Sequence, residues 1–242
     1  MDTAARLLDA WERGAARTAT DRALSLLAAA EPELGVDILA ALSIGRRDAR
    51  LLELRTRLFG DVLVGLATCA ACGELLELEF SAADLMLGPG SDPDEPAVLR
   101  ASGYELRVRP LDSRDLVGIA QLHDIPTARE ELLLACVLGA SRDGTEVPAD
   151  QLPTAALDMV EEWLAAADPQ ADIEMALHCP GCAAGWRQGF DIVSFLWAEI
   201  DAWARRTVYD VHRLAAAYGW REGDILAMSA PRRQAYLDLV GT

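Results

Sequence analysis

The chain has 242 residues, of which 52% are hydrophobic, enough to bury a sizeable core in one or two domains. Its formal net charge of −17 at pH 7 opposes binding to nucleic acid or to an anionic membrane surface, because both carry negative charge. The N-terminal segment lacks the apolar stretch of a signal peptide, and no apolar run approaches the ~20 residues of a membrane span. We therefore expect a cytoplasmic protein with no nucleic-acid partner and no membrane segment.

Residues 1–60 are expected to form a helical N-terminal region. Alanine- and leucine-rich stretches predict short helices at residues 3–13 and 19–30. A longer helix is predicted over residues 46–59, where leucines recur at helical spacing among arginines. Gly60 follows and is a natural C-terminal stop, because glycine adopts left-handed backbone angles without strain.

Residues 61–192 are expected to contain a β element, because the hydrophobic pattern changes from helical spacing to alternation. Apolar side chains alternate over residues 62–66 and again over residues 76–80, which predicts two short strands joined by a turn. A second pair of strands is predicted at residues 172–178 and 186–190 from the same pattern. The turn of each pair carries a Cys-x-x-Cys motif, and this motif pair is the one internal repeat that we recognise in the sequence.

The two motifs are Cys69-Ala70-Ala71-Cys72 and Cys179-Pro180-Gly181-Cys182. Each has the form of a zinc-ribbon half-site, in which one tight turn supplies two thiolates, and two half-sites complete a closed tetrahedral zinc site. Residues 73–178 separate them, far more than the ~15–20 residues between the half-sites of a compact ribbon. We therefore predict a ribbon that is split by an inserted unit. The predicted metal is one structural zinc ion per chain, bound by Cys69, Cys72, Cys179 and Cys182.

Other roles for these cysteines stay open from the sequence alone. A catalytic zinc needs an open position, which four thiolates do not leave. A redox-active motif would begin a helix in a thioredoxin-like unit, whereas both motifs here are predicted to lie between strands. Unligated thiols and an oxidised, disulfide-bridged site are the remaining alternatives. The fifth cysteine, Cys136, lies in a leucine-rich stretch and is interpreted as a small buried hydrophobic residue.

The inserted unit is predicted to be helical over about residues 111–170. A proline-rich polar stretch before it predicts a loop, and an alternating stretch predicts one more strand. The expected elements are a loop at 88–96, a strand at 104–109, a helix capped by Ser113, and helices at about 127–139 and 152–166.

Residues 193–242 are expected to form a long helix followed by a helical hairpin tail. Apolar residues recur at spacings of three and four from Leu196 to Tyr218, and Gly219 ends this helix. The aromatic residues of the region are expected to dock residues 219–240 on the rest of the fold, or to contact a partner protein. The candidate interface residues are Trp197, Trp203, Trp220 and Tyr236.

The predicted fold is therefore α+β and mostly helical. It consists of a split four-cysteine zinc-ribbon-like β element, an inserted helical unit and a C-terminal helical tail. No nucleophile elbow, phosphate-binding loop, dinucleotide-binding glycine motif or His-Glu-x-x-His motif is present in the sequence. We therefore expect no catalytic residues and no enzymatic activity.

The C-terminal third of the chain contains a series of specific motifs. They are the second cysteine motif, Trp186, Phe190-Asp191-Ile192, Phe195-Leu196-Trp197-Ala198-Glu199-Ile200, Val211-His212-Arg213-Leu214-Ala215, Ala217-Tyr218-Gly219-Trp220, Asp224-Ile225-Leu226 and Arg232-Arg233 with Tyr236-Leu237. Through these motifs the C-terminal third resembles the corresponding part of phage baseplate assembly proteins, whose relatives occur in the gene clusters of bacterial contractile injection systems. Looser similarity extends the resemblance over most of residues 38–240, through Arg46-Arg47-Asp48, the first cysteine motif and the stretch from Arg107 to Leu116. This resemblance implies a baseplate or hub component, or an assembly factor for one, without catalytic residues.

From these features we expect a non-enzymatic structural or assembly protein of a contractile, phage-tail-like injection particle. It would act in the bacterial cytoplasm through contacts with baseplate or hub proteins. One alternative is a zinc-ribbon transcription regulator, although Arg232-Arg233 is a small basic cluster for DNA binding. A metal-dependent enzyme is the other alternative.

Overall fold

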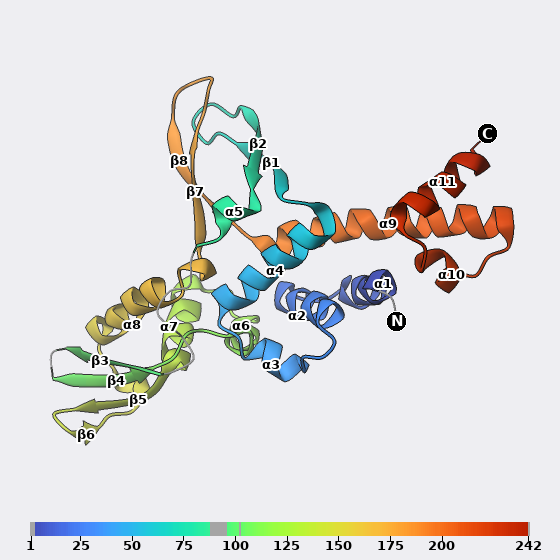
Figure 1. Ribbon diagram of the computed structural model, residues 1–242. Helices are drawn as coiled ribbons and strands as arrows, with labels where there is room; N and C mark the ends of the chain where they lie inside the picture. Colours follow the sequence, from blue (N-terminus) through green and yellow to red (C-terminus); the bar gives the residue numbers. More distant parts are fainter. Residues whose placement is uncertain (1–2, 88–95, 102, 242) are drawn as a thin grey trace. The chain divides into compact units, whose positions relative to one another are not determined.

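The computed structural model describes residues 3–87, 96–101 and 103–241 and shows a mixed α+β protein (Figure 1). Helices predominate, and the strands form small antiparallel sheets. The predicted loop at 88–96 lies outside the described residues except for residue 96. No helix among the described residues combines the length and the apolar composition that a membrane-spanning segment requires.

The chain forms two compact units, one built from both ends of the sequence and the other from one continuous stretch. The first unit combines Met1–Val36 with Ile192–Thr242, so it joins the N-terminal helices to the C-terminal ones. The second unit is the continuous stretch Asp37–Asp191, which contains both cysteine motifs.

The first unit consists of helices and their connections, with no strand among its described residues. Leu196, Ile200 and Leu214 of the stripe predicted along its longest helix are buried, whereas Tyr218, at the end of that stripe, is 38% exposed. Gly219 has a positive φ of 68° and follows the last turn of this helix, as predicted. The helices of the unit are α1 (Thr3–Gly14), α2 (Ala19–Ala30), α9 (Ile192–Tyr218), α10 (Glu222–Leu226) and α11 (Ala230–Val240).

The C-terminal tail packs inside this unit. Leu214 of α9, Ile225 of α10 and Leu237 of α11 form one buried cluster, with Trp220 and Tyr236 packed against it. Helices α10 and α11 both contact α9, so residues 219–240 complete an apolar core rather than hanging free from it. The helix pattern explains this directly, because each short helix buries one apolar side and leaves the other to water.

Replacing Leu237 by alanine is therefore expected to lower the free energy of unfolding by about 2–5 kcal/mol, the usual cost of a cavity left by leucine. Leu237 is only 3% exposed and is the one buried residue of α11. Leu239 in the same helix is 66% exposed, so Leu239→Ala is the matched control and should change stability little. Urea unfolding of both variants measures the difference, and equal effects would contradict the packing role of Leu237.

The second unit contains the strands and the remaining helices. Its elements are α3 (Val36–Ala40), α4 (Ile44–Phe59), β1 (Val62–Thr68), β2 (Leu75–Ser81), α5 (Ala82–Leu85), β3 (Ala97–Ala101), β4 (Tyr104–Val108), α6 (Ser113–Ile119), α7 (Ile125–Cys136), β5 (Val137–Arg142), β6 (Thr145–Glu146), η1 (Ala149–Gln151), α8 (Thr154–Ala167), η2 (Pro169–Ala171), β7 (Ile173–His178) and β8 (Gly185–Phe190). Strands β1 and β2 form one hairpin, and β7 and β8 form another.

The strand predicted at residues 104–109 is present as β4, but residues 111–170 are not purely helical, because β5 and β6 lie among them. This corrects the prediction of a helical insertion. The strands form a four-stranded antiparallel sheet in the order β3-β4-β5-β6, and its apolar side packs against α7 and α8. The helix predicted to run to residue 139 ends at Cys136, where the chain continues directly as β5. Cys136 is fully buried in this core, as predicted, and burial raises the pKa of its thiol to about 12.

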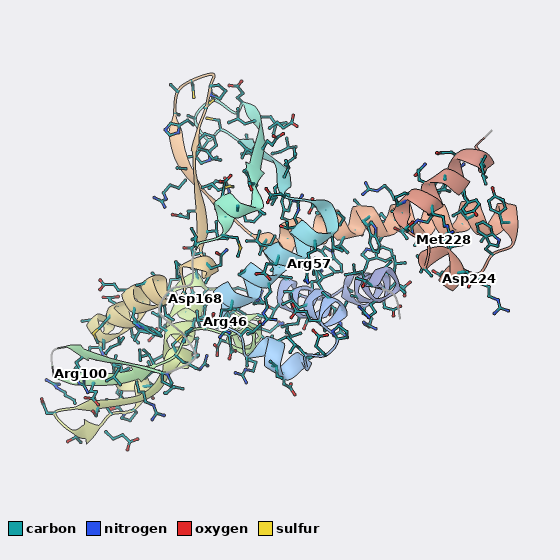
Figure 2. All side chains as sticks on the ribbon, in the orientation of Figure 1. Arg46, Arg57, Arg100, Asp168, Asp224 and Met228 are labelled. Atoms are coloured by element: carbon teal, nitrogen blue, oxygen red, sulfur yellow. The ribbon has the colours of Figure 1, made fainter. Side chains whose placement is uncertain are left out.

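Helix α4 is fixed at both ends by features that its sequence supplies. The Ser43 side chain accepts a hydrogen bond from the backbone N–H of Arg46, and Gly60, with a φ of 92°, ends the helix as predicted. The backbone N–H of Gly45 donates to the Asp168 carboxylate over 2.8 Å. Figure 2 labels Asp168 beside Arg46, at the N-terminal end of α4.

Asp48, on the first turns of α4, gives the folding free energy a specific pH dependence. Burial raises its pKa from 3.8 to about 6, even though the Arg47 guanidinium donates to it over 2.7 Å. The folded protein thus holds this proton to a higher pH than the unfolded chain, so Asp48 contributes most stability below pH 4. That contribution is lost as pH rises through 6.

We expect Asp48→Asn to remove this loss. Relative to the wild type, the variant should gain about 2–3 kcal/mol in free energy of unfolding between pH 4 and pH 7. Urea unfolding of both proteins across this range measures the difference, in which the other carboxylates cancel. A difference that is constant with pH would show that Asp48 has an ordinary pKa in the folded protein.

Candidate metal centre

The first cysteine motif is a tight turn between β1 and β2. The backbone N–H of Cys69 donates to the carbonyl of Glu74 over 2.9 Å, and the N–H of Gly73 donates back to the carbonyl of Cys69 over 2.8 Å. Gly73 has a φ of 77°, a left-handed conformation that glycine adopts without steric cost. The turn therefore places both cysteine side chains at the tip of the hairpin.

The second motif makes the same turn between β7 and β8. Cys179 donates to the carbonyl of Ala184 over 2.9 Å, and Ala183 donates back to the carbonyl of Cys179 over 2.9 Å. Ala183 takes the position that Gly73 holds in the first turn and has a φ of 60°. A left-handed alanine is strained by about 1 kcal/mol, so the surrounding turn imposes this conformation.

The repeat extends from the motifs into the strands, further than the sequence alone indicated. Leu63 pairs with Phe80 in the first hairpin, and Ile173 pairs with Phe190 at the same distance from the cysteines in the second. The rings of Phe80 and Phe190 meet edge to face, with centroids 5.7 Å apart and an interplanar angle of 85°. The two hairpins therefore have the same register and bring equivalent positions together.

The four cysteines of the two motifs converge, as the sequence predicted. Their Sγ atoms all lie within 4.8 Å of one another, with Cys69 3.8 Å from Cys182 and Cys72 3.6 Å from Cys179. These separations exceed the ~2.05 Å of a disulfide bond. They match the edge of a tetrahedron whose metal–sulfur bonds are about 2.3 Å long, which is about 3.8 Å. The donor set and its spacing thus fit a tetrahedral metal site.

Each hairpin contributes one buried and one exposed cysteine. Cys69 and Cys179 are 1% and 2% exposed, whereas Cys72 and Cys182 reach the surface. Backbone N–H groups of Cys72 and Ala71 point at the Cys69 sulfur and lower the pKa of its thiol to about 7. A thiolate is the form that binds metal, so these N–H groups prepare Cys69 as a ligand.

Cys179 has the opposite balance. The N–H of Cys182 donates to its sulfur and lowers the pKa, but burial and the adjacent Cys72 and Glu74 side chains together raise it to about 12. The Cys179 thiol donates to Glu74 Oε2 over 3.3 Å. A metal ion would supply the positive charge that holds this sulfur as a thiolate.

Glu74 is the residue of the site that the sequence did not single out. Its carboxylate also occupies the space beside Gly181, where a Cβ atom would come within 2.0 Å of Glu74 Oε2. The only available signal was its place two residues after Cys72, and the equivalent residue of the second hairpin is Ala184. His178, next to Cys179, is exposed and lies outside the cysteine cluster.

The candidate interface residues lie in the first unit, where they make contacts within the chain. Trp197 packs over Gly14 and stacks with the Arg22 guanidinium, 4.6 Å from its ring centroid. Trp203 packs against the buried cluster of Leu8, Ala204 and Leu226. The rings of Trp220 and Tyr236 meet edge to face with centroids 4.8 Å apart. All four side chains are half-buried.

Comparison of the chain with protein-family models, curated proteins and solved structures finds no match in any of the three. The functional argument therefore depends on the residues and the geometry of the chain itself.

Proposed function

We propose that Cys69, Cys72, Cys179 and Cys182 bind one Zn²⁺ ion as a closed structural site. We further propose that the protein acts, without catalysis, through protein contacts in a contractile, phage-tail-like injection particle. The observation that carries the first part is the convergence of four thiols from two matching hairpins. The second part is supported by the resemblance of the C-terminal third to phage baseplate assembly proteins.

The donor set supports zinc among the common metals. Soft thiolates in a tetrahedral arrangement select zinc or iron over magnesium, calcium or manganese, which prefer oxygen ligands. Four cysteine ligands also fill the coordination shell of zinc, so no position remains for a water or a substrate. The site would therefore act mechanically, by joining two hairpins whose cysteines lie up to 113 positions apart in the sequence.

The test of the metal is elemental analysis of the full chain, purified without affinity resins that carry metal. We expect one equivalent of zinc per chain. Iron would instead give the visible absorption of a ferric tetrathiolate and would overturn the assignment of zinc while keeping the site. Less than a tenth of an equivalent of any metal, with the four motif cysteines reactive toward a thiol reagent in the native protein, would overturn the site itself.

The test of the assembly role is genetic. In a bacterium whose chromosome carries this gene beside sheath, tube and baseplate genes, deletion should abolish intact particles in electron micrographs of lysates, and the wild-type gene should restore them. A gene encoding Cys179→Ser should not restore them. Normal particle numbers and normal sheath contraction after deletion would contradict the proposed role.

A further inference from the structure

A groove of about 570 Å³ runs between the two hairpins of the second unit. Residues 77–80 of β2 and residues 173–177 of β7 line it, together with residues from α5 and the turn after it. Figure 1 shows β2 and β7 as the facing strands of the two hairpins. Successive side chains of a strand point to opposite faces, so lining by consecutive residues means that both strands turn an edge toward the groove.

The backbone hydrogen bonds show which groups those edges offer. Ala82 donates to the carbonyl of Asp61, and Cys69 donates to that of Glu74, which places the bonded pairs of the first hairpin at every second residue. The N–H and C=O groups of Glu77 and Glu79 therefore point away from β1, toward the groove.

The second hairpin follows the same rule. The Cys179 N–H bonds to Ala184, so the N–H and C=O groups of Glu174 and Ala176 point away from β8. Among the described strands, β2 pairs only with β1 and β7 pairs only with β8. Two strand edges with outward-pointing backbone groups thus border one groove.

The side chains around the groove divide into an apolar set and an acidic set. Leu78, Phe80, Ile173, Met175 and Leu177 lie on the faces that the two hairpins turn toward each other, as the Phe80–Phe190 contact shows. The acidic residues of the strands, Glu77, Glu79 and Glu174, alternate with these apolar residues and project to the opposite faces of the hairpins. None of the described residues that line the groove is an arginine or a histidine.

Two of the acidic side chains lack a counter-charge among the described residues. Glu174 pairs with Arg187 over 2.6 Å, and Asp84 accepts a hydrogen bond from the backbone N–H of Ser81. Glu77 and Glu79 form no ion pair with any residue that the structure describes. The groove therefore has an excess of negative charge beside an apolar surface.

We propose that this groove binds an extended, cationic segment of a partner protein, one in which apolar residues alternate with arginine or lysine. The segment adds as a strand, hydrogen-bonded to the edges of β2 and β7. Its apolar side chains meet Leu78, Phe80 and Met175, while its basic side chains lie beside Glu77 and Glu79. Strand addition of this kind takes affinity from the backbone and specificity from alternate side chains.

The cysteine cluster closes one end of the groove, because Cys72 precedes β2 and Cys179 follows β7 directly. Metal binding would hold the two edges at a fixed separation. This step rests on the proposed metal site, whereas the charge preference of the groove does not.

The experiment uses the full chain as purified, with its metal content measured, and a fluorescent synthetic peptide of alternating valine and arginine at 150 mM salt. We expect saturable binding, seen by fluorescence anisotropy. The double variant Glu77→Gln with Glu79→Gln should weaken it at least tenfold, because two charge contacts are lost. The matched control is Glu130→Gln with Glu131→Gln, which changes net charge equally on the exposed side of α7. It should weaken binding less than twofold.

Two further peptides test the geometry. A peptide methylated on every second backbone nitrogen cannot hydrogen-bond to one of the two strand edges, and it should bind at least tenfold more weakly. A peptide with the same composition but separate blocks of valine and arginine should also bind weakly. An equal loss of peptide affinity in both double variants would show attraction to the overall negative charge of the protein and would overturn the proposal. Unchanged affinity for the methylated peptide, or the absence of saturable binding, would overturn it as well.

The proposed metal site and the proposed binding groove can be tested independently of each other. If the purified chain holds no metal but the Glu77 and Glu79 variant still loses binding selectively, the groove stands and the metal site does not. If the chain holds zinc and the peptide does not bind, the reverse follows. Sedimentation could instead show that the chain dimerises in the absence of peptide and that the variant with Glu77→Gln and Glu79→Gln stays monomeric. That result would show that a second copy of the chain occupies the groove, and it would overturn the proposal of a cationic partner.

Discussion

Cys179→Ser should lose the metal and about 5 kcal/mol or more of the free energy of unfolding. Zinc binding by four thiolates contributes about 10–16 kcal/mol in small zinc domains, which is comparable to the whole stability of an ordinary domain. Cys179 is 2% exposed, so its serine replacement also leaves a hydroxyl in a site built for thiolates. Urea unfolding and elemental analysis of the same samples measure both effects.

Cys136→Ala is the matched control for this prediction. Cys136 is as buried as Cys179 but is the last residue of α7 and lies in the core with β4, far along the chain from either motif. It should keep one metal per chain and lose only about 1 kcal/mol, the cost of a small cavity. A chelator should destabilise this control as strongly as the wild type and should leave Cys179→Ser unchanged. A Cys179→Ser protein that keeps its metal, or its urea midpoint, would contradict the metal site.

Gly45→Ala should lower the free energy of unfolding by about 2–3 kcal/mol through overpacking. An added Cβ would come within 2.1 Å of Asp168 Oδ1 and 2.9 Å of the backbone nitrogen of Ala171. The carboxylate cannot simply move away, because it accepts the Gly45 N–H over 2.8 Å and so holds the first turn of α4. The backbone at Ala171 moves less readily than the end of a side chain, so the steric strain from the added Cβ would remain in the folded protein.

Gly118→Ala gives the opposite sign and serves as the control for Gly45→Ala. Gly118 lies in α6, is exposed, and would meet no atom within 4 Å of an added Cβ. Alanine is the better helix former, so this variant should be stabilised by about 0.5–1 kcal/mol. Thermal melting followed by circular dichroism compares the two. Destabilisation by both substitutions would mean that the close approach at Gly45 is not the cause.

Local patterns predicted the parts of the fold that depend on neighbouring residues. The alternation of Ile173, Met175 and Leu177 placed β7, and the glycine at position 60 marked the end of α4. The cysteine spacing predicted which four side chains meet, because two turns with two thiols each can close one tetrahedral shell.

Elements that depend on distant residues were harder to predict. Strand β5 begins at Val137, directly after a helix of similar apolar composition, and its pairing with β4 and β6 makes it a strand. The grouping of α1 and α2 with α9 also arises from packing between the two ends of the chain. The helical spacing of apolar residues identifies the apolar face of each helix but not the helix that it packs against. Glu74 approaches Cys179 across the two hairpins, a contact with no mark in the local sequence.

The separation of the cysteines affects the order in which the protein can fold during its synthesis. Cys69 and Cys182 are 113 positions apart, so at about 5–20 residues per second the second motif appears about 6–23 s after the first. Throughout that interval the first hairpin has two thiols and an apolar face that includes Leu78 and Phe80, without the strand that meets them. The nascent chain must therefore pass through a stage that is vulnerable to premature oxidation and aggregation, and the first unit closes later still, once α9 to α11 have been made.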